Sequence, residues 1–265
     1  MHRLVTYVMY LLDTQSLWIS LTHNICLSPY INKIFWEMFI MSIQKNLENI
    51  RARISAACER SGRDPSDVTL IAVTKTRTVD EINEAVSLGL TELGENRVQE
   101  LLEKYDKVCG DVHWHLIGHL QRNKVKYIAD KVCMIHSVDT VPLAAEIDRQ
   151  CAKHGRVMNI LAEVNISGEE SKSGMTAAEV YDFMDQVSAM PHVKVCGLMT
   201  MAPKFAQNDE IRRIFAQLSQ LAVDISAKKY DNISMDKLSM GMSSDFETAI
   251  EEGSHMVRIG TALFK

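Results

Sequence analysis

Eight short apolar segments recur along the chain after residue 67, and residues with helical spacing separate most of them. The first, Leu70 to Val73, is apolar at every position, which indicates a strand buried on both faces, as in a parallel sheet. Residues 42–60 precede it with Ile43, Leu47 and Ile50 at the spacing of one helix face. The expected strands cover residues 68–74, 91–94, 113–118, 134–138, 160–166, 193–199, 236–240 and 256–260.

This alternation restricts the chain to few architectures. Eight strands and their helices within about 200 residues predict an α/β protein with a single-domain (β/α)8 TIM barrel, near the lower size limit of that fold. An open doubly wound sheet is the alternative, although no strand is followed by the Gly-x-Gly-x-x-Gly turn of its dinucleotide-binding form. The chain reaches Lys265 soon after the last strand, so we expect no eighth helix and no second domain. Helix 42–60 should then cover that side of the barrel.

Local signals support the helical segments between the strands. In a capping box, a hydroxyl and a carboxylate three residues later each satisfy a backbone amide at the helix start. Glycine accepts the left-handed conformation in which many helices end. Capping-box spacing occurs at Thr78 with Glu81, Thr176 with Glu179 and Ser244 with Glu247, and glycines stand at the expected helix ends 89, 110, 155 and 253.

The first 40 residues differ from the rest of the chain. They hold Trp18 and Trp36 and few charges, but polar residues and Pro29 interrupt every apolar stretch before it reaches membrane-spanning length. They also lack the clear cleavage site of a signal peptide. We therefore expect residues 1–40 to be an extension outside the fold, with Met41 as the true start, and residues 41–265 to form the barrel.

Charge and cysteine content exclude several classes of protein. The net charge is −5 and no basic cluster occurs, which argues against a nucleic-acid partner. The 6 cysteines are scattered without Cys-x-x-Cys spacing and indicate reduced thiols. We expect a cytoplasmic protein without a membrane partner.

Lys75 stands where the first strand ends. Barrels and doubly wound sheets build their active sites at this end of their strands. An amine held there against apolar walls would lose hydration and favour its neutral form, which can attack an aldehyde to give a Schiff base. The alternative is a solvated lysine at the start of a loop, which is the usual state of this residue type.

Two late segments favour a phosphate site. Residues 238–247 indicate a strand, a loop of small residues and a helix start, where exposed amides and serine hydroxyls suit a dianion. Gly260 and Thr261 end the last strand, and barrels commonly build phosphate sites from the loops after strands seven and eight. The alternative is that Gly241 and Gly260 only permit tight turns.

An imine-forming lysine on strand one and a phosphate site on strands seven and eight together fit pyridoxal 5'-phosphate (PLP). From Met41 onward the chain resembles the YggS/PROSC family, the pyridoxal phosphate homeostasis proteins. The stretches that carry the resemblance span the barrel in order: 72–75 (Ala-Val-Thr-Lys), 94–96 (Gly-Glu-Asn), 114–118 (Trp-His-Leu-Ile-Gly), 171–174 (Ser-Lys-Ser-Gly), 197–199 (Gly-Leu-Met), 239–243 (Ser-Met-Gly-Met-Ser) and 257–261 (Val-Arg-Ile-Gly-Thr).

The resemblance implies a fold-type III PLP barrel like the N-terminal domain of alanine racemase, with the cofactor aldehyde bound to Lys75 as a Schiff base. It implies that Arg258 lies near the cofactor ring and that Asn96 and Asn165 line the same mouth. Family members usually continue past Leu-Phe with Gly-Ala-Arg, whereas this chain stops at Lys265, which puts contacts of the tail in doubt. The residues that match the phosphate grip are Ser239, Gly241, Met242, Ser243, Gly260 and Thr261.

The implied function is reversible PLP binding in vitamin B6 homeostasis, with buffering or delivery to PLP-dependent apoenzymes, no robust turnover and a monomeric state. An arginine beside the pyridine nitrogen disfavours protonation of the ring and so weakens it as an electron sink. Alanine racemases also add a second domain, for which this chain has no residues left. Two rivals stay open: a PLP-dependent, racemase-like enzyme, and a Schiff-base aldolase-like barrel that binds a sugar phosphate.

Three histidines, His113, His115 and His119, invite a metal interpretation. On a strand, positions 113 and 115 share a face, whereas 119 falls in the following loop. The sequence places no carboxylate or cysteine that completes an obvious ligand set, so we expect no metal site.

Overall fold

The computed structural model describes residues 29–169, 172–203 and 205–265. Its contacts divide the chain into two compact units, Met1–Met41 and Ser42–Lys265, and the second unit contains the strands. Most of the expected N-terminal extension, residues 1–28, lies outside the described residues, and its boundary stays a prediction. Within the part of the chain that is described, no helix is long and apolar enough to span a membrane.

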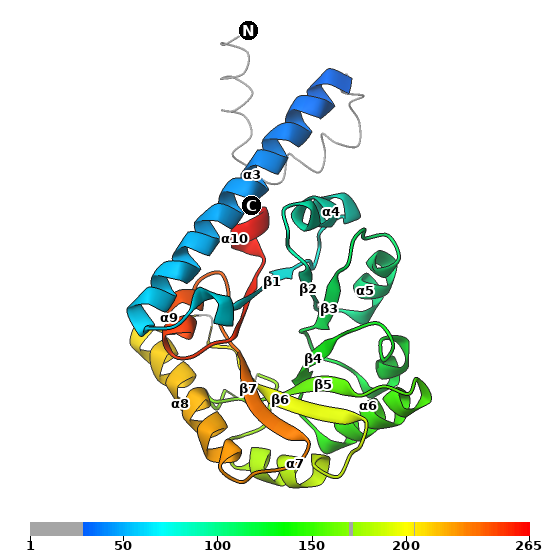
Figure 1. The fold of residues 1–265 in the computed structure, drawn as a ribbon, viewed down its shortest axis with the longest axis vertical. Coiled ribbons are helices and arrows are strands. Elements are labelled where there is room, and N and C mark those ends of the chain that lie inside the picture. Colours follow the sequence, from blue (N-terminus) through cyan, green and yellow to red (C-terminus); the bar gives the residue numbers. More distant parts are fainter. Residues whose placement is uncertain (1–28, 170–171, 204) are drawn as a thin grey trace. The chain divides into compact units, whose positions relative to one another are not determined.

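Eight parallel strands close into a barrel in chain order, with β1 paired to both β2 and β8 (Figure 1). The predicted (β/α)8 barrel is therefore confirmed, and the open doubly wound sheet is excluded. The strands are β1 Thr69–Val73, β2 Glu92–Glu95, β3 His113–Leu116, β4 Met134–Val138, β5 Met158–Glu163, β6 Val193–Met199, β7 Ile233–Ser239 and β8 Met256–Ile259.

Helical segments connect the strands. Between β3 and β4 the connection is a 3-10 helix, η2, rather than an α-helix. The helical elements among the described residues are α3 Pro29–Ser61, η1 Pro65–Asp67, α4 Val79–Ser87, α5 Val98–Tyr105, η2 Arg122–Tyr127, α6 Val141–Lys153, α7 Glu179–Val187, α8 Asn208–Ser226, α9 Phe246–Glu251 and α10 Thr261–Phe264.

β4 and β6 have the predicted bounds, and the other six strands differ from theirs, most at the end of β5 and the start of β7. β5 ends at Glu163, because Val164 forms only an isolated bridge with Met175 and the chain then turns. β7 begins earlier than predicted, at Ile233, where side chains are only partly buried and the apolar pattern is weak.

The helix predicted over 42–60 begins earlier, at Pro29. Within the barrel unit its residues contact the segments that flank β8: Arg53 pairs with Glu247 of α9 at 2.6 Å, and the Asn46 side-chain amide donates to the Leu263 carbonyl of α10 at 3.0 Å. Residues 42–61 thus cover the side of the barrel expected for them. The expectation that no helix follows β8 is wrong, since the short α10 lies there.

Two of the three expected capping boxes are present. Thr78 and Glu81 exchange hydrogen bonds at 2.7 and 3.2 Å, and Thr176 and Glu179 do so at 2.8 and 3.3 Å. The capping box predicted for Ser244 and Glu247 is wrong, because α9 begins only at Phe246. There the Asp245 carboxylate accepts from the Met242 amide at 2.6 Å and closes the turn instead.

Apolar side chains from five strands pack together inside the barrel. They form one buried cluster whose members include three methionines, as expected for residues that fill gaps in a core. Met256 belongs to it and lies two residues before Arg258, so both side chains share the inner face of β8. The cluster contains Ile71, Met134, Leu161, Cys196, Met199 and Met256.

Gly197 in β6 allows an unusually close approach of β7. Its φ is +154°, and a Cβ atom placed on it would lie 1.7 Å from the Lys237 carbonyl oxygen. The register between β6 and β7 shifts between Val195 and Gly197. Only glycine fits here without moving one of the two strands.

We expect Gly197→Ala to lower the free energy of unfolding by about 2–4 kcal/mol, because the added methyl group displaces the β7 backbone. Gly155→Ala is the matched control, since Gly155 also has positive φ, +60°, but a Cβ atom placed on it would meet nothing within 4 Å. The control should cost about 1 kcal/mol, the penalty for the left-handed conformation alone. Urea unfolding of both variants measures the difference, and equal losses would show that the close approach is unimportant.

Candidate functional site

The carboxyl ends of the parallel strands meet at one end of the barrel, here called the mouth. Lys75 lies there, two residues after β1, and its side chain is exposed. The expectation that apolar walls shield this lysine is wrong, because the strand ends at Val73 and burial ends at Thr74. The amine is therefore open to a ligand that enters from solvent.

A buried ion pair holds the backbone that precedes Lys75. The Lys104 ammonium lies 2.5 Å from Glu95 Oε1 and donates to the Thr74 carbonyl at 2.9 Å. The Thr74 hydroxyl donates to the same Glu95 oxygen at 2.9 Å. Both charges are almost fully buried, so either one left alone would be strongly destabilising. Sequence reasoning missed this pair, although Glu95 stands in the Gly-Glu-Asn stretch.

The residue that follows Lys75 is also constrained. Thr76 has a positive φ of 61°, which is unusual for a β-branched residue. Its amide donates to Glu100 of α5 at 3.0 Å, and this hydrogen bond is the main reason that the pKa of Glu100 falls below its ordinary value. The Lys75 amine therefore extends from a backbone fixed on both sides.

Arg258 carries a positive charge into the barrel from β8. Its two terminal nitrogens donate to the Ser239 hydroxyl at 2.5 Å and to the Thr200 carbonyl at 3.0 Å. Burial lowers the pKa of Arg258 to about 10, against the opposing effects of Asp245 and Glu163, so the group stays protonated at neutral pH. Arg258 and Ser239, which the sequence assigned to the same site, are thus in direct contact.

Glu163, at the end of β5, is an acid that sequence reasoning missed. Burial and the nearby charge of Asp139 raise its pKa to about 7, and Arg258 opposes this rise. Its side chain is buried near the guanidinium of Arg258, and a carboxyl with this pKa changes charge near neutral pH.

A chain of hydrogen bonds runs through the barrel away from Arg258. The Ser239 hydroxyl contacts His136 Nδ1 at 2.9 Å, and His136 Nε2 contacts His115 Nδ1 at 2.9 Å. His115 Nε2 in turn lies 2.7 Å from Glu92 at the start of β2. Burial and the neighbouring His115 and Arg258 lower the pKa of His136 well below its ordinary value, so this central ring is neutral.

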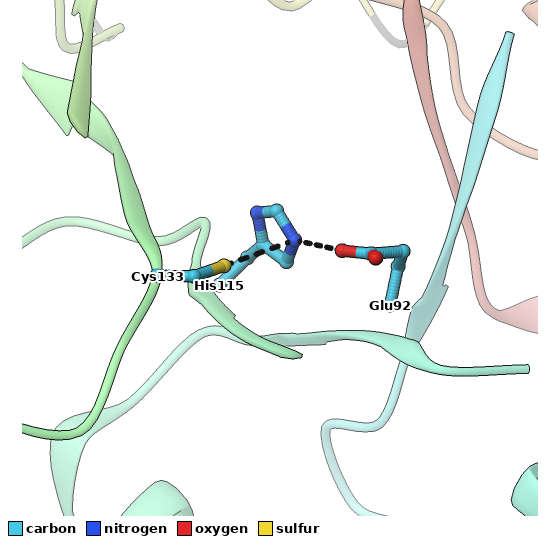
Figure 2. A group of neighbouring side chains, drawn as sticks. All are labelled: Glu92, His115 and Cys133. Atoms are coloured by element: carbon cyan, nitrogen blue, oxygen red, sulfur yellow. Dashed lines mark hydrogen bonds and ion pairs between the residues drawn. The ribbon is translucent and has the colours of Figure 1, made fainter. Parts of the chain in front are cut away.

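The far end of this chain lies where the strands begin, opposite the mouth. Figure 2 shows Glu92, His115 and Cys133 converging there from three neighbouring strands or their approaches. The expectation that no carboxylate or cysteine accompanies the histidines is wrong, because β2 and the residue before β4 supply both. His119 is exposed in the loop after β3 and is not part of the group.

The loops after β7 and β8 touch at the mouth. The Arg258 amide donates to the Gly241 carbonyl at 3.0 Å, and the Ala262 amide donates to the Ser243 hydroxyl at 3.3 Å. Gly241 has a φ of +94°, and a Cβ there would lie 2.6 Å from that of Ala249. The predicted grip residues that these loops bring together are Gly241, Met242, Ser243, Gly260 and Thr261.

Gly260 also links these loops to the start of the Lys75 segment. A Cβ on Gly260 would lie 3.2 Å from Val73 Cβ and 3.3 Å from the Val73 carbonyl oxygen. Since Val73 stands two residues before Lys75, the end of β8 passes directly beside the segment that carries the amine.

The two asparagines differ in what they offer. Asn96 Oδ1 is buried without a partner, one of two such side-chain atoms in the described part of the chain. Asn165 instead uses its side chain within its own loop: it donates to the Glu169 carbonyl at 2.8 Å and accepts from the Gly168 amide at 3.0 Å. The structure leaves Asn96 free to meet a ligand and gives Asn165 no hydrogen bond to the other predicted residues.

Sequence comparisons agree on one family. The model of the alanine racemase N-terminal domain matches residues 45–265. A pyridoxal phosphate homeostasis protein of Aquifex aeolicus is 43% identical over 225 residues, which cover 84% of this chain and 98% of the relative. The Escherichia coli K12 protein of the same name is 39% identical over 227 residues, covering 84% and 95%.

Solved structures of similar fold include a relative with PLP bound and an alanine racemase. PipY of Synechococcus elongatus, solved with PLP bound, has a TM-score of 0.75 and 33% identity, covering 84% of this chain and 100% of that one. Alanine racemase of Clostridium difficile is similar in fold alone, with a TM-score of 0.64 at 14% identity over 84% of this chain and 56% of that one.

Glu163 should make stability depend on pH. Its folded-state pKa of about 7 lies above the ordinary value of 4.5, so the folded protein keeps a proton that the unfolded chain has lost between these values. Stability is therefore lost as pH rises through this window. We expect Glu163→Gln to stabilise the ligand-free protein relative to wild type by roughly 2–3 kcal/mol more at pH 8 than at pH 5.

Urea unfolding at the two pH values measures this difference. Glu103→Gln, which alters an exposed acid of α5, is the control and should show the same pH dependence as wild type. An unchanged pH dependence in Glu163→Gln would contradict the assignment.

Proposed function

Because this chain belongs to the family of pyridoxal phosphate homeostasis proteins, we propose that it binds PLP at the mouth of its barrel and holds it reversibly for buffering or delivery. The observation that carries the proposal is the exposed Lys75 amine on a fixed backbone, which follows Val73 where that residue lies beside the end of β8. The bound PLP reported for PipY supports the same cofactor here.

The donor set of the mouth fits this cofactor. PLP combines an aldehyde, an aromatic ring with polar substituents and a phosphate dianion. The buried Asn96 Oδ1 lacks a partner and can accept from a ligand, and Arg258 supplies positive charge in the interior. Gly241 and Gly260 allow the two loops to pack closely, which lets backbone amides join the Ser243 and Thr261 hydroxyls in meeting a phosphate.

In this proposal Lys75 holds the aldehyde carbon covalently, with loss of one water molecule. Its exposure favours exchange, since water and competing amines can reach the bond and return the aldehyde to solution. Lys104 and Glu95 act indirectly, by holding the Thr74 backbone.

The phosphate contacts fall to Gly241, Met242, Ser243, Gly260 and Thr261. We assign Ser239 a different part from that implied by the resemblance, because its hydroxyl is already shared by Arg258 and His136 in the barrel interior. Ser239 positions the guanidinium. Asn165 stays a weaker candidate, since its own loop uses both ends of its amide.

Arg258 favours a carrier over an efficient enzyme. Bound PLP is a weaker electron sink when its ring nitrogen is unprotonated, and an arginine that stays charged beside that nitrogen would oppose its protonation. We therefore propose a monomeric carrier in the cytoplasm whose transient recipients are PLP-dependent apoenzymes. Size-exclusion chromatography tests the monomeric state, and transfer from the loaded chain to an apoenzyme tests delivery.

Absorbance spectroscopy tests the covalent bond. We expect the PLP-loaded wild-type chain to show an imine band that borohydride abolishes, and Lys75→Ala to lack it. Lys107→Ala is the matched control and should keep the band, because Lys107 is an exposed lysine in the turn after α5. A band that persists unchanged in Lys75→Ala would show that another residue holds the aldehyde.

The same preparations separate the alternatives. Steady racemisation of an amino acid that is lost in Lys75→Ala would replace the carrier with a racemase-like enzyme. Failure to bind PLP, together with borohydride trapping of a sugar phosphate on Lys75, would favour the aldolase-like barrel.

The phosphate site predicts a selective effect of Thr261→Val. Loss of its hydroxyl should weaken PLP binding about 10- to 100-fold, because a hydrogen bond to a charged group contributes about 1.5–3 kcal/mol. Binding of pyridoxal, which lacks the phosphate, should not change. Fluorescence titration with both ligands measures this, and equal weakening for both would place the phosphate elsewhere.

A further inference from the structure

A second group of polar side chains lies at the opposite end of the barrel from the mouth. We propose that Glu92, His115 and Cys133 bind one divalent transition-metal ion, zinc by preference. The proposal does not rest on the proposed PLP function, and none of the three residues is among those assigned to the cofactor.

The geometry of the three side chains fits a single ion. One potential ligand atom from each lies within 4.8 Å of the other two. The His115 Nε2 and Cys133 Sγ atoms are 3.4 Å apart, close to the separation of about 3.5 Å that tetrahedral zinc imposes on nitrogen and sulfur ligands. Glu92 Oε2 lies 2.7 Å from the same nitrogen and needs only a small outward movement to coordinate beside it.

The ligand chemistry selects the class of metal. A thiolate, an imidazole and a carboxylate together suit zinc, cobalt or a similar ion, whereas magnesium and calcium require oxygen ligands. Three protein ligands leave a fourth position for water. The exposed His113, which contacts Glu92 Oε1 at 2.7 Å, lies near the solvent side of the group.

The surroundings hold the central ligand in place. His115 is almost fully buried, and its other ring nitrogen contacts His136 Nε2 at 2.9 Å. Metal-binding histidines are commonly fixed by a hydrogen bond at the second ring nitrogen. The Glu92 side chain is 26% exposed, so an ion can reach the site from solvent.

Cys133 also places a polarisable sulfur near the Glu92 carboxylate and against an apolar cluster. A bound ion would neutralise both and replace the proton of the thiol.

Cobalt titration of the EDTA-treated, dialysed chain tests the proposal, in the presence and absence of PLP. We expect one cobalt ion per chain, with a near-ultraviolet thiolate-to-cobalt band that zinc abolishes by displacement. Cys133→Ser should lose this band, and Glu92→Gln should keep it but bind at least about 10-fold more weakly, because a ligand is lost while the thiolate remains. Circular dichroism checks that both variants are folded.

Cys109→Ser is the matched control, because Cys109 is a free, exposed cysteine outside the group. It should bind cobalt as wild type does. No thiolate band in wild type, an unchanged band in Cys133→Ser, or loss of the band in Cys109→Ser would each overturn the site. These outcomes leave the proposed PLP function untouched, since the Lys75 bond is read from a different chromophore.

Discussion

The buried guanidinium of Arg258 imposes conditions on much of the barrel interior. A cation removed from water must receive hydrogen-bond acceptors from the protein, and here the Ser239 hydroxyl and the Thr200 carbonyl supply them. Those acceptors stand at the ends of β7 and β6, so the charge fixes how these strands approach β8. Burial lowers the pKa of Arg258 and raises that of Glu163. The attraction between the two charges opposes both shifts but does not cancel them.

This condition explains why the mouth carries two kinds of polar residue. The Ser239 hydroxyl hydrogen-bonds to Arg258 and His136 in the barrel interior and is unavailable to a ligand. Lys75 and Thr261 are instead exposed at the rim. Asn96 is half-buried, and its buried side-chain oxygen has no partner. The rim thus offers an amine and a hydroxyl, while the interior holds the guanidinium.

Sequence alone predicted the architecture well, because the strand signal is local. The apolar runs of β4 and β6 marked both of their ends, and the Thr78 box marked the start of α4. The sequence did not predict contacts between residues that only the closed barrel brings together. Ser239 and His136 are separated by 103 positions, and Lys104 meets Thr74 only after α5 folds back on the sheet. The spacing of Ser244 and Glu247 misled because Asp245 supplies the turn that precedes α9.

The candidate site was predictable to the extent that it resembles a known family. Motifs located Lys75 and the two loops after β7 and β8, but they did not reveal that Lys75 is exposed or that Asn165 bonds within its own loop. The run of histidines drew attention to His115 but did not reveal its partners at the other end of the barrel, since only strand pairing places Glu92 of β2 and Cys133, just before β4, beside β3. Such convergence is a property of register, which local patterns do not specify.

The hydrogen-bond chain from Arg258 to Glu92 has a polarity. Arginine can only donate and an ionised carboxylate can only accept, so every polar hydrogen is satisfied when Ser239, His136 and His115 each donate toward Glu92. A cation that takes the Nε2 lone pair of His115 leaves its hydrogen on Nδ1, and His136 must then exchange tautomers as well. Ser239 would receive a hydrogen bond where it had given one. A cation bound at Glu92 and His115 would thus reverse the hydrogen bond between His136 and Ser239, beside Arg258. Only protons would need to move, and the backbone would stay unchanged.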